Sequence, residues 1–173
     1  SLTLNWLAFL LSFPIILAEL SYPFAKRIHC FPHFHLGAIL GSVPLAGAIS
    51  VTGSVSKLPW GYALAIGLWV SGFDIIYSIQ DVEIDRRLGI KSIPACFGEK
   101  IALNVSAALH VLSILTLLPL AQGWISLAAI GAAGAAMLVQ HIEARRGKLA
   151  TAFNLNLLIS IMLGFGLLVD FVM

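Results

Sequence analysis

The chain has 173 residues, which is enough for one domain, and a formal net charge of +2. Hydrophobic residues make up 60% of the chain, charged residues make up only 10%, and the mean hydropathy is +0.99. Soluble domains carry about 25% charged residues. The composition therefore argues against a water-soluble enzyme and against a nucleic-acid-binding protein, and it predicts a protein that lies in the lipid bilayer.

Long stretches without Lys, Arg, Asp or Glu indicate the membrane-spanning segments; they are residues 1–18, 28–56, 58–73, 101–142 and 149–169. A transmembrane helix takes roughly 20 apolar residues, so the stretch 101–142 has to hold two of them. Turn residues and charges then place helices at about residues 2–20, 35–51, 59–80, 101–120, 124–142 and 151–172. We therefore expect an all-α membrane protein, a bundle of six transmembrane helices that forms a single domain over residues 1–173.

Basic residues concentrate in alternate connections between the expected helices. The first connection, where Pro23 and Pro32 interrupt the helical pattern, holds Lys26 and Arg27. The third connection holds Arg86, Arg87, Lys91 and Lys100, the fifth holds Arg145, Arg146 and Lys148, and only Lys57 is left for the others. By the positive-inside rule, connections one, three and five face the cytoplasm and both chain ends lie outside, in a membrane of the bacterial inner-membrane type.

The N-terminal end adds an expectation of its own. Ser1 leads directly into apolar residues, without the basic segment that begins a signal peptide. On the expected topology the first helix would have to enter the membrane from outside, so something upstream has to place it. We therefore expect an odd number of further helices before residue 1, with signal-peptide cleavage as the alternative.

The cysteines and three of the histidines lie in the connections as well. Cys30 and Cys96 fall in connections one and three, and because both would face the reducing cytoplasm, a structural disulfide is not expected. An isolated cysteine pair is also a weak signal for a metal. His29, His33 and His35 are spaced loosely enough to suggest a metal, but a hydrated interfacial loop is the favoured interpretation.

Acidic residues cluster at the end of the third expected helix. Four of the eight lie in Asp74-Ile-Ile-Tyr77-Ser-Ile-Gln80-Asp81-Val-Glu83-Ile-Asp85. With about 100° per residue, a continuous helix would place Asp74, Asp81 and Asp85 on one face. Glu83 would point away from that face, and Tyr77 would flank it. Asp81 and Asp85 would be about 6 Å apart along the axis, which suits a divalent cation such as Mg²⁺ held by carboxylates, waters and substrate phosphates.

Basic residues supply the second half of the predicted site. Tyr22 and Lys26 are four residues apart and share a helical face, while Arg27, Arg87 and Lys91 gather at the same end. Ammonium and guanidinium groups can neutralise a diphosphate leaving group. The orientation rule alone would also explain these cations, and a solvated helix end would explain the carboxylates. A small cation transporter or channel, with the three aspartates as its path, is the rival function.

These residues resemble motifs of the UbiA-type intramembrane aromatic prenyltransferases. The window 74–85, followed by Gly89-Ile-Lys91-Ser92-Ile-Pro94-Ala-Cys-Phe-Gly98, is similar to the second aspartate-rich motif of that family and the loop after it. Residues 22–27, Tyr-Pro-Phe-Ala-Lys-Arg, are similar to its Tyr-Pro-x-x-Lys-Arg segment, and residues 37–53 and 153–156 to parts of two later helices. The likeness runs over essentially the whole chain and is specific around residues 74–98.

The resemblance also implies what lies outside this chain. Family members resemble nine-helix proteins, and the present chain is similar to their last six helices, or C-terminal two thirds. The first aspartate-rich motif of the family, Asn-Asp-x-x-Asp-x-x-x-Asp, does not occur in residues 1–173. The missing odd number of helices would then be three, and the chain alone is expected to have little or no activity.

The activity implied by the resemblance is transfer of a polyprenyl group from its diphosphate to an aromatic acid such as 4-hydroxybenzoate, in quinone synthesis. Asp81 and Asp85 would carry Mg²⁺ and the diphosphate, and Lys26, with Tyr22 and Arg27 nearby, would stabilise the departing diphosphate. Asp74 and Tyr77 would face the allylic cation and the aromatic ring, and Arg87 or Lys91 would bind the aromatic carboxylate. A naphthoate-type acceptor of a menaquinone pathway stays open as an alternative.

Overall fold

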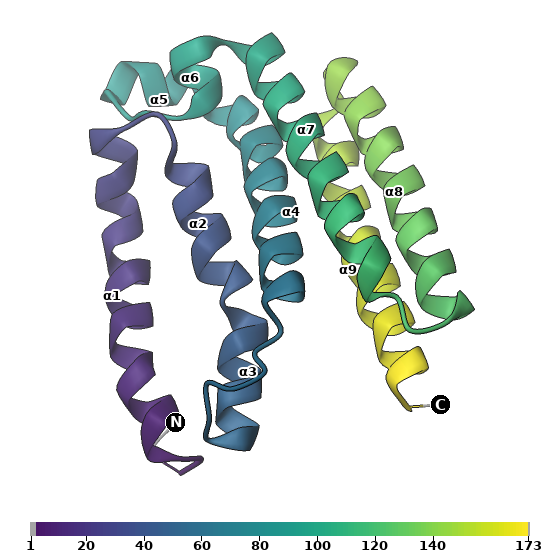
Figure 1. Ribbon diagram of the computed structural model, residues 1–173. Helices are drawn as coiled ribbons and strands as arrows, with labels where there is room; N and C mark the ends of the chain where they lie inside the picture. The colour runs from purple at the N-terminus through teal and green to yellow at the C-terminus, as the bar shows by residue number, and fades with distance from the viewer. Residues whose placement is uncertain (1–2, 173) are drawn as a thin grey trace.

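The computed structural model describes residues 3–172, with side chains through residue 169, and this part of the chain is helical without strands (Figure 1). The helices are α1 (Trp6–Ile28), α2 (Pro32–Gly41), α3 (Val43–Thr52), α4 (Trp60–Ser78), α5 (Val82–Leu88), α6 (Ile93–Phe97), α7 (Glu99–Leu117), α8 (Trp124–Arg145) and α9 (Leu149–Val172). Short 3-10 turns, Ile79–Asp81 and Leu118–Leu120, follow α4 and α7.

Six helical stretches within the described residues are long and apolar enough to cross a membrane, which confirms the predicted bundle and its six spans. The spans alternate in direction, so the start of α1 and the end of α9 lie at one end of the bundle (Figure 1). Short helices α5 and α6, together with the α1–α2 connection, lie at the opposite end, which we call the loop end. The connections that carry the basic residues therefore meet at the loop end.

Helix α1 is longer than predicted. It continues through Pro14 and Pro23 to Ile28, so Pro23 does not interrupt the first connection. Prolines are tolerated inside membrane helices when neighbouring groups satisfy the freed backbone carbonyls. Lys26 and Arg27 consequently lie in the last turn of the helix, where positive charge is favoured by the helix dipole.

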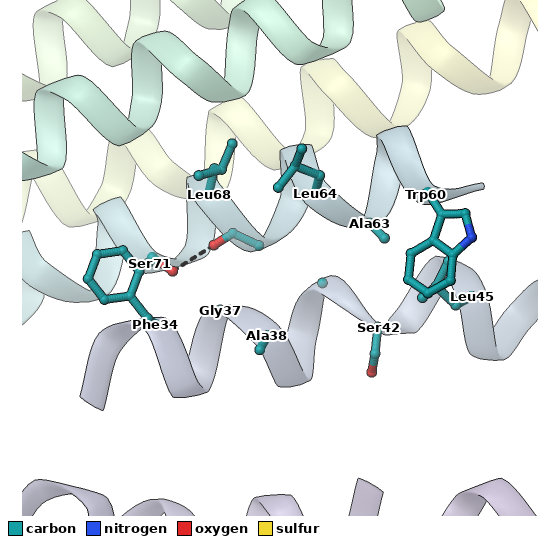
Figure 2. Close-up of a pocket in the computed structure, with 12 residues that line it drawn as sticks. Phe34, Gly37, Ala38, Ser42, Leu45, Trp60, Ala63, Leu64, Leu68 and Ser71 are labelled. Atoms are coloured by element: carbon teal, nitrogen blue, oxygen red, sulfur yellow. Dashed lines mark hydrogen bonds between the residues drawn. The ribbon is translucent and has the colours of Figure 1, made fainter. Parts of the chain in front are cut away.

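The second span is two helices rather than one. α2 begins with Pro32 at its first position and ends at Gly41, and α3 begins with Pro44 in its first turn. Pro44 has no N–H to donate and its ring clashes with the preceding turn, so the helix restarts here. The pair α2–α3 crosses as one stretch beside α4, with an apolar groove of about 450 Å³ between them that extends from Ser71 to Trp60 (Figure 2).

Glycines bring α2 and α4 into close contact. A Cβ atom placed on Gly41 would lie 2.6 Å from the backbone oxygen of Ala63, and one placed on Gly67 would lie 3.0 Å from the backbone oxygen of Gly37. Small residues allow this approach of two helix backbones in a membrane. On its other side α4 is held by α7, where the hydroxyls of Ser106 and Ser113 donate to backbone oxygens of α4.

The third span breaks where a continuous helix was expected. α4 ends at Ser78, the 3-10 turn Ile79–Asp81 follows, and α5 then runs across the loop end (Figure 1). A 3-10 turn advances about 120° per residue instead of 100°, and the axis changes direction. The prediction of one continuous helix through Asp74, Asp81 and Asp85 is therefore wrong, although Asp81, which precedes α5, and Asp85 within α5 remain about one turn apart.

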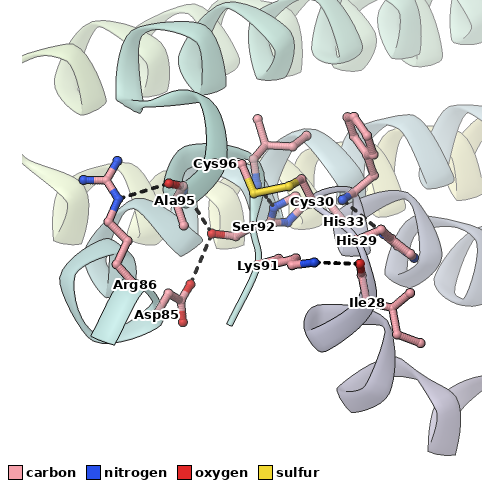
Figure 3. The surroundings of a disulfide bond; sticks show 12 residues. Ile28, His29, Cys30, His33, Asp85, Arg86, Lys91, Ser92, Ala95 and Cys96 are labelled. Atoms are coloured by element: carbon pink, nitrogen blue, oxygen red, sulfur yellow. Dashed lines mark hydrogen bonds between the residues drawn. A yellow bond between two sulfur atoms is a disulfide. The ribbon is translucent and has the colours of Figure 1, made fainter. Parts of the chain in front are cut away.

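Cys30 and Cys96 form a disulfide bond, with their Cα atoms 6.2 Å apart (Figure 3). The prediction of unpaired cysteines is therefore wrong. That prediction rested on the compartment assigned to the two connections, and it did not consider their separation in space. The short helix α6, whose first turn is capped by the Ser92 hydroxyl, carries Cys96 to the end of α1.

Candidate functional site

Polar side chains from three helices meet at Asp74, which lies four residues before the end of α4. The Asp74 carboxylate accepts two hydrogen bonds on the same atom, Oδ2, from Nδ1–H of His33 (2.7 Å) and from the hydroxyl of Tyr22 (3.2 Å). Tyr22 comes from α1 and His33 from the first turn of α2. The side chain of Asp74 keeps 13% of its surface exposed, so the carboxylate is enclosed by protein without being sealed off.

His33 is fully buried, and the prediction that places it in a hydrated loop is wrong. The backbone N–H of Ile93 donates to its Nε2 atom (3.2 Å). Nε2 therefore carries no proton, and the single ring proton lies on Nδ1, which faces Asp74. Sequence reasoning missed this residue because its burial depends on how closely α2 approaches α4. The signal that could have revealed the burial is the pair of glycines, Gly37 and Gly41, that follows His33 in the same helix.

Tyr22 and Lys26 share a face of α1, as predicted from their spacing. The Nζ atom of Lys26 lies 5.1 Å from the centre of the Tyr22 ring, within the range of a cation–π interaction. Among the described residues Lys26 has no carboxylate partner within ion-pair distance. Lys26 thus brings a positive charge to the end of α1, one helical turn beyond the tyrosine that contacts Asp74.

Asp81 ends the 3-10 turn that precedes α5, and Asp85 lies within α5, the short helix at the loop end (Figure 1). Asp81 is exposed, and Asp85 is half-buried and accepts a hydrogen bond from the Ser92 hydroxyl (3.2 Å; Figure 3). No group of three His, Cys, Asp or Glu side chains suitable for a metal occurs in the described part of the chain. Two carboxylates that take the remaining ligands from waters and substrate phosphates do fit Mg²⁺, which is commonly bound in this way.

The other predicted cations have different positions. Lys91 is bound to the end of α1, since its Nζ donates to the backbone oxygen of Ile28 (3.0 Å; Figure 3) and its backbone N–H donates to that of Lys26. Arg87 is 81% exposed and lies 4.0 Å from Glu83 on the outer side of α5. Arg27 is exposed at the end of α1. A role for Arg87 or Lys91 in binding an aromatic carboxylate stays a prediction.

Aromatic rings of α4 and α9 contact one another, and the two from α4 lie close to Asp74 in the sequence. The Tyr77 ring is 5.6 Å from the ring of Phe153 in α9, and Phe73 completes the group at 5.7 Å from Phe153. Tyr77 keeps 45% of its surface exposed. Sequence reasoning identified Tyr77 but not Phe73, which directly precedes Asp74, or the contact with Phe153.

Comparison with known proteins places this arrangement in a family. Residues 1–166 match the model of the UbiA prenyltransferase family. Over 153 residues the chain is 33% identical to the 4-hydroxybenzoate octaprenyltransferase of Methylococcus capsulatus, with 85% of this chain and 52% of the relative covered. The protein of the same name from Alkalilimnicola ehrlichii is 32% identical over 98% of this chain and 60% of its own length.

A solved structure supports the same assignment. The apo structure of a UbiA homologue from Aeropyrum pernix K1 superposes with a TM-score of 0.89 at 38% identity, covering 98% of this chain and 66% of the homologue. The chain thus spans between about half and two thirds of the length of these relatives. From the extent of the family match and the shared helical architecture, we conclude that the chain is an integral membrane protein and belongs to the UbiA prenyltransferase family.

Proposed function

We propose that this chain supplies one part of the active site of an aromatic prenyltransferase, the part that contains Asp74, Tyr22 and Lys26. Such an enzyme moves a polyprenyl group from its diphosphate to an aromatic acid. The observation that supports the proposal most directly is the meeting of Tyr22 and His33 on the Asp74 carboxylate, with Lys26 adjacent. The relatives named 4-hydroxybenzoate octaprenyltransferase suggest 4-hydroxybenzoate as the acceptor and ubiquinone synthesis as the context. Family membership favours a transferase over the cation-channel alternative.

Binding of the diphosphate belongs to the loop end. Asp81 and Asp85 would hold Mg²⁺, which when bound supplies Lewis-acid charge for the diphosphate oxygens. Lys26 would add a positive charge where the leaving group gains negative charge, and such fixed charges act most strongly in a water-poor site. Asp81 is exposed and Asp85 is half-buried, so a metal that arrives with the substrate could reach both carboxylates.

The acceptor would lie deeper, between Asp74 and the aromatic group. Cleavage of the bond between the allylic carbon and the diphosphate oxygen leaves an allylic cation. The Asp74 carboxylate and the faces of Tyr77 and Phe153 suit a cation of this kind. The ring carbon beside the phenol oxygen then forms the new carbon–carbon bond, and the ring loses its proton.

A reconstitution experiment tests the proposal. Membranes with residues 1–173 alone, and membranes in which they are co-expressed with a three-helix segment that carries the first aspartate-rich motif of a related enzyme, receive polyprenyl diphosphate and radiolabelled 4-hydroxybenzoate. We expect prenylated product only in the co-expressed sample and only with Mg²⁺, because the first motif does not occur in this chain. A parallel sample with 1,4-dihydroxy-2-naphthoate tests the menaquinone-type acceptor. Full turnover by the isolated chain would contradict the need for the first aspartate-rich motif. Absence of product in every sample would contradict the proposed function.

A further inference from the structure

We propose that His33 is a positioning residue: it fixes the orientation of the Asp74 carboxylate and connects it to the loop that contacts Asp85. Its kinetic consequence rests on the function proposed above, whereas its geometry does not. No described atom donates to Oδ1 of Asp74, so Oδ2 is the anchored oxygen and Oδ1 the oxygen left for a ligand.

An aspartate needs such an anchor because the torsion that turns its carboxylate is intrinsically broad. Two donors from different helices remove that freedom. Of the two, His33 makes the shorter contact, at 2.7 Å against 3.2 Å for Tyr22. Its ring is itself fixed, since it is fully buried and its second nitrogen is held by the Ile93 N–H. His33 therefore presents its proton to Asp74 from one direction only.

The same histidine lies on a chain of contacts between the two acidic parts of the site. The Ser92 hydroxyl donates to Asp85, the next residue, Ile93, donates to Nε2 of His33, and Nδ1–H of His33 donates to Asp74. The disulfide joins Cys30, three residues before His33, to Cys96, three residues after Ile93 (Figure 3). Movement of the loop at Asp85 would thus be transmitted to the orientation of Asp74.

Other roles for His33 fit less well. Both ring nitrogens have protein partners, so neither is available to a metal. Its side chain has no exposed surface, so it does not reach a substrate. We therefore assign it a positioning role and not a catalytic one.

The geometry can be tested without activity. The full chain labelled with ¹⁵N-histidine is studied by NMR in lipid bilayers, and the His33→Gln variant identifies the His33 signals. We expect a neutral ring with its proton on Nδ1. A proton on Nε2 would overturn the proposal, because Nε2 could not then accept from Ile93.

A stability cycle tests the pairing of His33 with Asp74, again without activity. His33→Leu and Asp74→Leu each leave the partner's polar atoms unpaired, whereas the double variant removes both partners, so its loss is expected to be smaller than the sum of the single losses. Midpoints of thermal unfolding in detergent measure this. Losses that simply add would overturn the pairing.

Kinetics of the reconstituted enzyme test positioning. We expect His33→Leu to lower kcat by about 10- to 100-fold, the range for loss of a hydrogen bond to a charged group, with the KM for the diphosphate unchanged. The His33→Gln variant should keep most of the activity, because an amide can donate to Asp74 and accept from Ile93. The exposed residue His29 provides the control, His29→Gln, which should behave as the wild type.

The outcomes separate the two proposals. Equal kcat values for the Leu and Gln variants, both as folded as the wild type, would overturn the positioning role. A wild-type enzyme that forms no product under any condition would count against the proposed function instead, while the NMR and stability measurements would still decide whether His33 holds Asp74. Should His33→Leu fail to fold, the ring tautomer and the Gln variant remain decisive.

Discussion

Charged residues at the loop end differ in whether the fold already uses them. Lys91 and Arg86 donate to backbone oxygens and hold the loop in place. Glu83 and Arg87 are more than 80% exposed and 4.0 Å apart, and such a surface pair contributes little to stability. Asp85 accepts one hydrogen bond, which leaves carboxylate lone pairs for a cation. These differences predict which acidic residues matter for activity.

We expect Asp81→Asn and Asp85→Asn each to lower Mg²⁺-dependent prenyl transfer by more than about 100-fold, as loss of a charge that acts on a developing anion does elsewhere. Glu83→Gln should be nearly silent, because Glu83 lies two residues, or about 200°, from Asp85 on α5 and is 88% exposed. Product formation by the reconstituted enzyme measures all three. Equal losses for the three variants would show that the metal ligands are assigned wrongly.

Residues related by local helix geometry could be predicted from the sequence, whereas residues related by packing could not. Tyr22 and Lys26 are in contact because they are one turn apart on a single helix. His33 and Asp74 are 41 residues apart, and their contact exists only because glycines let α2 approach α4. A histidine beside a proline in a connection has the same local pattern whether it is buried or hydrated.

At the scale of helices, the breaks differ in how visible they are in the sequence. α5 ends at Leu88 and is followed by Gly89, which adopts a positive φ of 66° that favours glycine, and α6 begins after the capping Ser92. The turn Ile79–Asp81 contains neither proline nor glycine, so nothing in the pattern of residues predicts the change of direction after α4. The continuous helix predicted through the three aspartates fails for this reason.

The α2–α4 contact supports a prediction with a control in the same span. Gly41→Ala should lower the thermal unfolding midpoint and the activity, because the new Cβ would lie 2.6 Å from the Ala63 backbone oxygen and the helices would have to separate. Gly47→Ala meets nothing within 4 Å, so it should be neutral or stabilise by up to about 1 kcal/mol through helix propensity. A Gly41→Ala protein as stable as the wild type would contradict the close contact.

The disulfide predicts a redox-dependent stability. It closes a segment of 66 residues in sequence separation, and disulfides of this kind typically stabilise by about 2–4 kcal/mol. Reductant should lower the unfolding midpoint of the wild type and speed hydrogen exchange at the Ile93 N–H. The double variant Cys30→Ser, Cys96→Ser should be insensitive to reductant. Detection of free thiols at both Cys30 and Cys96 in native protein that has not been exposed to reductant would contradict the disulfide bond.

For the whole molecule, the number of spans and the meeting of the basic connections at one end could be predicted from composition and charge alone. Apolar lengths determine the spans, and alternating direction brings every second connection to the same side. The sequence does not show how the helices pack around one another, because apolar residues face lipid and protein alike. The side of the membrane on which the loop end lies stays a prediction.

Cysteine labelling tests that orientation in the Cys30→Ser, Cys96→Ser background. Single cysteines at positions 86 and 146 should be missed by a membrane-impermeant reagent added from outside, and a cysteine at position 57 should be reached, since Lys57 lies apart from the other basic residues. A disulfide at an end assigned to the cytoplasm is unusual outside hyperthermophiles, which makes the measurement informative. Labelling of position 86 from outside would show that the loop end faces outward, opposite to the predicted orientation.

The cross-link between residues 30 and 96 also makes the polypeptide a closed covalent ring, with two open tails. Everything from α2 to α6 belongs to the ring, including the connection that carries Lys57 at the end opposite the disulfide. A protease that cuts once, after Lys57, would therefore open the ring without releasing a piece. Residues 1–57 and 58–173 would migrate together on a non-reducing gel, and they would separate only after the sulfur bridge is reduced.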